Sequence, residues 1–149
     1  SYEWDPCDQA KARELHQQLV TGHYEKAEHE DVLSIAQGIA GQKGHVHVAF
    51  GDVLRGDYAD TGDVVAELDR QLRGQYVLHP SNCFAYQKQQ RQVPEVGYSS
   101  QHKPFDPRAL EAEGKAFDER LAAMPVEYQP LALAMYAHPV AAKLELSPD

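Results

Sequence analysis

The sequence predicts a mostly α-helical domain with a small two-stranded β element, an α+β arrangement in one compact unit. Apolar residues recur at helical spacing towards both ends of the chain, and an aspartate followed by a proline opens two of these stretches. Two short runs near the middle are instead rich in β-branched and aromatic residues. With 149 residues, the chain can bury about 70% of its unfolded surface. We therefore expect a single domain over residues 1–149 that is stable without a disulfide or a metal.

The first predicted helix begins at Asp5, a natural N-cap, and has Pro6 at its first helical position. Proline is favoured there because the first backbone N–H groups of a helix have no partner within the helix. Ala12, Leu15 and Leu19 follow at spacings that place them on one face. This face is expected to pack on the core.

Two further helices are predicted over residues 24–40 and 60–74, each ended by glycine. An aspartate at position 60 or 63 caps the second of them. In both helices the apolar residues repeat at steps of three and four, which predicts a buried face. These faces consist of Val32, Ile35, Ala36 and Ile39 in the first and of Val64, Val65, Leu68 and Leu72 in the second.

A fourth helix is predicted over residues 105–124, again opened by an aromatic residue, an aspartate and a proline. Alternating steps of four and three predict a seam for another helix. The seam residues are Leu110, Gly114, Phe117, Leu121 and Met124. A short apolar helix is expected after Pro125, interrupted by Pro130 and Pro139 because proline removes a backbone donor.

The two β candidates are "HVHVAF" (residues 45–50) and "QYVLHP" (residues 75–80). Both are short and rich in residues that favour strands, so we expect them to pair as a small ribbon against the helices. Residues 94–105, punctuated by prolines and a glycine, are predicted to form the longest loop.

Composition narrows the classes of function. The net charge of −9, from 14 basic and 23 acidic residues, argues against direct nucleic-acid binding, which depends on lysine and arginine. No apolar run approaches the roughly 20 residues that span a bilayer, and the first residues are polar, which predicts no signal peptide. Two cysteines in unlike contexts predict no disulfide framework. We expect a cytoplasmic protein with no membrane association.

The histidines of "HVHVAF" are the main candidates for chemistry. On a strand, His45 and His47 point to the same side, so two imidazoles can reach one metal ion. His79, at the end of the other predicted strand, and Asp52 are available as further ligands. The alternative interpretation is a half-buried strand in which each imidazole makes an ordinary hydrogen bond. The metal interpretation predicts a transition metal held by His45, His47 and His79.

Two further sets of residues are candidates. Cys83 lies near a predicted helix start, where the helix dipole favours a thiolate nucleophile; the alternative is a buried structural cysteine. Tyr86, Tyr98 and Phe105 lie in or beside the long loop and are candidate anchors for a protein partner, because aromatic residues dominate interface energetics. They are equally compatible with folding back over the core.

The last 30 residues, "RLAAMPVEYQPLALAMYAHPVAAKLELSPD", carry one family resemblance. The matching features are Met124–Pro125, an apolar run from Leu131 to Tyr136, and a final group made of Ala141 or Ala142, Leu144, Leu146 and Ser147. This pattern resembles the helix-turn-helix segment of sigma-type transcription factors and some phage antiterminators. The resemblance implies a partner in the transcription machinery. The alternative is a pair of packed terminal helices.

No constellation combines a nucleophile, a base and an oxyanion donor at compatible spacing. We therefore expect a small acidic cytoplasmic regulatory or adaptor protein that acts by protein–protein binding. A component of the transcription machinery is the more specific partner expected. The alternative is a metal-dependent, hydrolase-like enzyme that uses His45, His47 and His79.

Overall fold

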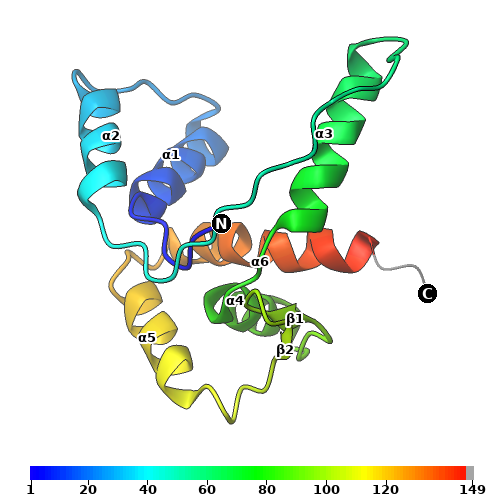
Figure 1. The fold of residues 1–149 in the computed structure, drawn as a ribbon. Coiled ribbons are helices and arrows are strands. Elements are labelled where there is room, and N and C mark those ends of the chain that lie inside the picture. Colours follow the sequence, from blue (N-terminus) through cyan, green and yellow to red (C-terminus); the bar gives the residue numbers. More distant parts are fainter. Residues whose placement is uncertain (147–149) are drawn as a thin grey trace.

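The computed structural model describes residues 1–146 and confirms a mostly helical fold with a small antiparallel sheet (Figure 1). The described residues form six helices and two strands. The helices are α1 (Asp8–Thr21), α2 (Glu30–Ala40), α3 (Thr61–Gln75), α4 (Pro80–Gln90), α5 (Glu111–Ala122) and α6 (Gln129–Leu146), and the strands are β1 (Gly97–Tyr98) and β2 (Lys103–Pro104). Ser147, the last residue of the helix-turn-helix resemblance, lies outside the described residues.

The core lies where α4 packs along α6, with α5 beside them (Figure 1). Phe117 of α5 reaches into this core and meets the ring of Tyr136 edge to face, with centroids 5.6 Å apart. Aromatic pairs of this kind stabilise by about 1 kcal/mol beyond their burial. The main core cluster contains Leu78, Cys83, Phe84, Ala85, Phe105, Leu110, Phe117, Tyr136, Ala137 and Val140.

A buried polar cluster fastens the N-terminal segment and α1 to the helices of the core. Asp8 is 4% exposed, and its Oδ2 accepts hydrogen bonds from the Tyr136 hydroxyl at 2.7 Å and from Arg120 Nε at 2.6 Å. Arg120 also donates to the carbonyl of Asp5 at 2.6 Å, and its guanidinium lies 5.5 Å from the centre of the Trp4 ring. Burial and the Asp8 carboxylate raise the pKa of the Tyr136 hydroxyl, which therefore stays protonated and keeps donating.

The predicted seam of the fourth helix is confirmed. Leu110, Phe117 and Met124 are buried, and Gly114 faces the ring of Phe84. A Cβ at position 114 would lie 2.9 Å from Phe84 Cζ, so glycine lets α5 approach α4 closely. The Phe84 ring is itself fixed edge to face against Phe105, at 5.0 Å. The spacing of the apolar residues was therefore a sufficient signal for this contact.

The predicted interruption of the last helix is wrong. Residues 129–146 form one helix, α6, with Pro130 in its first turn and Pro139 in its interior. Proline in the first turn removes no needed hydrogen bond, whereas Pro139 leaves one carbonyl of the preceding turn without its helical donor. Tyr136, Ala137 and Val140 are buried in the core around this point, so packing keeps the helix continuous across Pro139. The turn of a helix-turn-helix is therefore missing from the described part of this segment.

The predicted strands are also placed wrongly. The sheet consists of β1 and β2, inside the segment predicted to be a loop. Two residues of their connection adopt positive φ, Ser99 at 64° and His102 at 51°, and these close a tight turn. Residues 76–79 run without regular structure into α4, and residues 45–50 pair only through a bridge between Val46 and Tyr2. Residues 45–50 thus meet the N-terminal segment, and residues 75–80 join α3 to α4.

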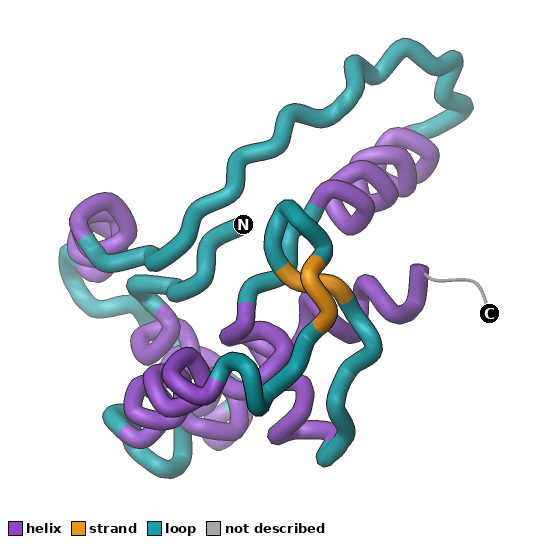
Figure 2. Tube along the Cα trace, turned by 60° about the horizontal axis from the view of Figure 1, so that its bottom comes forward, coloured by secondary structure: helices purple, strands orange, loops and turns teal. Residues whose placement is uncertain are grey.

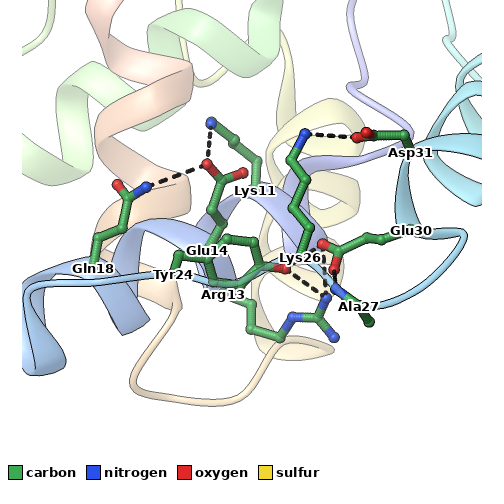
Figure 3. Close-up of polar contacts among 9 residues, drawn as sticks. All are labelled: Lys11, Arg13, Glu14, Gln18, Tyr24, Lys26, Ala27, Glu30 and Asp31. Atoms are coloured by element: carbon green, nitrogen blue, oxygen red, sulfur yellow. Dashed lines mark hydrogen bonds and ion pairs between the residues drawn. The ribbon is translucent and has the colours of Figure 1, made fainter.

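Helix α2 is shorter than predicted and is attached mainly through polar contacts. It begins at Glu30, whose carboxylate accepts hydrogen bonds from the Tyr24 hydroxyl and, at 2.9 Å, from the Ala27 amide. Figure 3 shows these contacts together with the ion pair from Arg13 of α1 to Glu30, at 3.3 Å. The loop before α2 is thereby ordered. Exposed ion pairs of this kind contribute little to stability, so α2 is held weakly.

The apolar faces predicted to be buried in α2 and α3 are not buried by this chain. Val32, Ile35 and Ile39 of α2 are each more than 60% exposed, and Leu72 of α3 is 67% exposed. Leu19 at the end of α1 is likewise exposed. Helical periodicity identified the apolar face correctly in each helix, but nothing within residues 1–146 covers it.

We expect Gly114→Ala to lower the free energy of unfolding by about 1–3 kcal/mol, because the new methyl group overpacks the contact with Phe84. Gly74→Ala in α3 is the matched control, since a Cβ there meets nothing within 4 Å. That variant should gain up to about 1 kcal/mol from helix propensity. Urea unfolding followed by circular dichroism measures both, and equal effects would contradict a close approach of α5 to α4.

Candidate functional site

The most prominent surface feature is a set of exposed apolar side chains on α2, on α3 and on the connection between them (residues 41–60). We call this set the apolar surface. Its members, 42% to 91% exposed, are Val32, Leu33, Ile35, Ile39, Val46, Val48, Phe50, Val53, Val65, Leu68 and Leu72. Figure 1 shows α2 and α3 projecting from the same side of the core, with the connection running between them. Groups of exposed apolar side chains mark binding sites in folded proteins.

The total surface area supports the same conclusion. A compact monomer of 16.7 kDa exposes roughly 7,600 Å² by the usual scaling of area with mass. This chain exposes 10120 Å². The excess, about 2,500 Å², is larger than the roughly 800 Å² that each partner buries in an interface of standard size. The chain therefore has enough uncovered surface for a large interface.

The connection behaves like a strand over its first half. His47, Ala49 and Gly51 line a cavity of about 300 Å³ shared with Leu68 and Leu72 of α3. The alternate residues Val46, Val48 and Phe50 lie outside this cavity, and Phe50 is the most exposed of them at 91%. Side chains of period two are the signature of an extended strand. Figure 2 shows this connection as a long loop that runs beside α3.

Charge is distributed unevenly around the apolar surface. Residues 32–51 contain one charged side chain, Lys43, and no acidic residue, although the chain as a whole carries −9. The interior of a protein interface is likewise depleted in charged residues. None of the described helices is long and apolar enough to cross a membrane.

A second feature is a cavity of about 370 Å³ between the N-terminal segment, the connection and the β1–β2 turn. The predicted ligands His45, His47 and His79 all line it. Asp52 does not line it and lies instead in the cavity beside α3. The other lining residues are Glu3, Val46, Val77, Leu78, Pro80, Tyr98, Ser99, Ser100, Lys103, Leu110 and Glu113.

Hydrogen bonds pair the N-terminal segment with the connection and hold this cavity together. The amide of Glu3 donates to the carbonyl of His45 at 2.9 Å, and the amide of His47 donates to the carbonyl of Ser1 at 2.9 Å. The Glu3 side chain is buried, and its Oε2 lies 2.8 Å from His45 Nδ1. Sequence reasoning missed Glu3, because no local pattern relates residues that are 42 positions apart.

The three histidines occupy different environments. His45 is largely exposed and paired with Glu3. His79 is 4% exposed, precedes α4, and has its Nε2 3.2 Å from the hydroxyl of Ser1. Within residues 1–146, no group of three or more His, Cys, Asp or Glu side chains is arranged to hold a metal ion. The cavity is thus lined by imidazoles and carboxylates, and the metal site stays a prediction.

The predicted aromatic anchors are not part of the apolar surface. Phe105 is 7% exposed and packs on Phe84 in the core, because the chain turns inward after β2. Tyr86 and Tyr98 are half-buried and pack against the same core. Of the two possibilities that the sequence left open, the structure shows folding over the core for Phe105.

Cys83 is a structural cysteine. Its side chain is fully buried in α4, and burial raises the pKa of its thiol to about 12. A thiol with this pKa is protonated at neutral pH and cannot act as a nucleophile. The dipole of α4 does not compensate for the loss of hydration.

Comparisons with known proteins add no assignment: no protein family, no characterised protein and no solved structure matches this chain.

Burial of His79 predicts a pH dependence of stability. Burial lowers the pKa of His79 from its ordinary value of about 6.5, and the opposing charge of Glu3 only partly offsets this. The unfolded chain then binds more protons than the folded chain at pH values just below about 6.5. The free energy of unfolding should therefore fall as the pH drops from about 7 to about 5. Urea unfolding at several pH values measures this, and His79→Gln should flatten the profile; an unchanged profile would contradict the assignment to His79.

Proposed function

We propose that the protein is a small acidic regulatory or adaptor protein that acts by binding another protein through the apolar surface. The observation that carries the proposal is the large apolar area that α2, α3 and their connection leave uncovered. Exposed apolar surface in water is unfavourable by about 25 cal/mol per Å², so a partner that covers it gains affinity. Both cysteines are free, which supports a reducing compartment such as the cytoplasm.

The arrangement of the fold supports the same role. Helices α4, α5 and α6 form a core without α2, so α2 is free to present its apolar face. A helix that offers residues at steps of three and four is a common recognition element for protein partners. The core therefore serves as a scaffold and the peripheral helices as the binding elements.

The transcription machinery is the more specific partner class in this proposal. Its support is the residue pattern of residues 120–149, which resembles the helix-turn-helix segment of sigma-type factors and antiterminators, whereas α6 runs through the position of the turn without interruption. The net charge of −9 favours a protein component of that machinery over its DNA, because phosphates require basic side chains.

Affinity capture from the source cell tests the proposal. The bait is the full chain, and Ile39→Lys is compared with Val126→Lys; these sites are 77% and 75% exposed, but only Ile39 belongs to the apolar surface. We expect Ile39→Lys to lower recovery of the specific partner by about tenfold or more, because a lysine in the middle of an apolar interface is poorly tolerated. Val126→Lys should leave recovery unchanged. Quantitative mass spectrometry measures both, and equal recovery by the two variants would contradict the proposal.

The alternative function is metal-dependent chemistry at the histidine cavity. The observation in its favour is that His45, His47 and His79 line one cavity together with the buried carboxylate of Glu3. Neutral imidazoles and carboxylates are the usual ligands of Zn²⁺, and a bound water of lowered pKa is the nucleophile in such hydrolases.

Elemental analysis of the purified, untagged protein tests this alternative. If it holds, the wild type carries about one equivalent of a transition metal and His47→Ala loses it while circular dichroism stays unchanged. His23→Ala is the control, since His23 is exposed and far from the cavity in the chain. A metal-free wild type that remains metal-free after incubation with Zn²⁺ would exclude the alternative.

A further inference from the structure

We propose that a second copy of this chain covers the apolar surface, through antiparallel pairing of residues 46–50 with the same residues of the partner copy. This inference rests on the proposed function and specifies one partner of the same surface. Three observations support it: the unpaired backbone edge of the connection (residues 41–60), the size of the uncovered area, and the absence of acidic residues from positions 32–51.

The backbone of the connection has an unpaired edge. Within the described chain, no backbone hydrogen bond involves any residue from Val48 to Tyr58. A run of β-forming residues with free N–H and C=O groups is a template for pairing with another strand. A second strand would satisfy these groups, whereas an apolar helix from another protein would leave them unpaired.

The pairing with the N-terminal segment decides which backbone groups are free. The carbonyls of Lys43 and His45 accept hydrogen bonds from Trp4 and Glu3 at 3.0 Å and 2.9 Å, and His47 donates to Ser1. In an antiparallel pair, successive residues turn their N–H and C=O groups to opposite edges. Residues 46, 48 and 50 therefore turn theirs to the edge away from the N-terminal segment.

This geometry predicts a register. A twofold axis through Val48 pairs it with Val48 of the second copy and pairs Val46 with Phe50 in both directions, so all six residues hydrogen bond at the free edges. Val46, Val48 and Phe50 of both copies then share one face of the ribbon. The other face of the ribbon is turned towards α3, across the cavity lined by Ala49 and Leu68.

The area and the charge both fit a second copy. Two chains that each cover an excess of about 2,500 Å² bury about 5,000 Å² together, within the range of permanent homodimers. Each chain carries −9, so self-association is favoured where acidic groups are absent, and residues 32–51, which include the paired segment and the α2 part of the apolar surface, contain none. A basic partner would instead be matched by acidic residues within the surface, which this segment lacks.

Sedimentation velocity over a range of concentrations tests the oligomeric state of the full chain. We expect the wild type to sediment with twice the mass of the 16.7 kDa chain. Phe50→Asp should weaken the dimer by at least about tenfold, because it places two carboxylates in an apolar interface. Val126→Asp is the matched control, an exposed valine outside the apolar surface, and should dimerise like the wild type. Circular dichroism confirms that both variants fold.

A cysteine scan tests the register. In a Cys7→Ser background, Val48→Cys should form a disulfide between copies under mild oxidation, because directly opposed residues have Cα atoms about 5.5 Å apart. Cys83 is buried and does not interfere. Val126→Cys should remain monomeric on a non-reducing gel.

The outcomes separate this inference from the proposed function. A wild type that is monomeric at every concentration overturns the dimer, even if Ile39→Lys still loses a captured partner and the proposed function stands. A dimer whose affinity is unchanged by Phe50→Asp, and in which Val48→Cys forms no disulfide between copies, overturns this interface. A dimer that has the expected variant effects, but captures no other protein, supports the inference and contradicts the adaptor function.

Discussion

The carboxylate of Asp8 is the constraint on which the placement of the N-terminal half depends. It is almost completely buried, and it is tolerable there because Arg120 and Tyr136 both donate to it. A buried charge that lost these donors would cost several kcal/mol. The position of α1 is therefore tied to α5 and α6 at one point, and Trp4, stacked on Phe117 and lying under Arg120, is held at the same point. From there the N-terminal segment fixes the start of the α2–α3 connection through Glu3.

The helices of the fold are consequently held by interactions of two different strengths. Helices α4, α5 and α6 share an apolar core with interlocked aromatic rings, which is the strongest source of stability available to a chain of this size. Helix α2 depends instead on exposed ion pairs around Glu30, and α3 on a limited contact with α6. Helices of 11 and 15 residues are marginal in isolation. A partner that covers their apolar faces therefore stabilises these two helices as well as binding them.

Sequence patterns predicted α1, α2, α3 and the seam of α5, because those features depend on local spacing and on side-chain size. For α4, which packs along α6 in the core, they indicated only a helix start near Cys83. They failed where the outcome depended on distant partners. The period of Val32, Ile35 and Ile39 reports which face of α2 prefers burial, but it contains no information about what lies opposite. The short strands failed for the same reason, since pairing depends on residues such as Tyr2 that are far away in the sequence. For the site, the sequence pointed to the three histidines that line one cavity, whereas it gave no sign of Glu3.

Residues 32–51, which contain no acidic side chain, expose the newly synthesised chain to aggregation. A run of alternating valines and a phenylalanine with an open backbone edge is the kind of segment that nucleates cross-β aggregation when it is exposed. Natural proteins protect such segments with flanking charges, and here the nearest acidic residues are Asp31 before the stretch and Asp52 after it. The strong negative charge of the rest of the chain provides the remaining protection, because like-charged molecules repel one another in solution. The excess of acidic residues in the rest of the chain therefore opposes non-specific association of this segment.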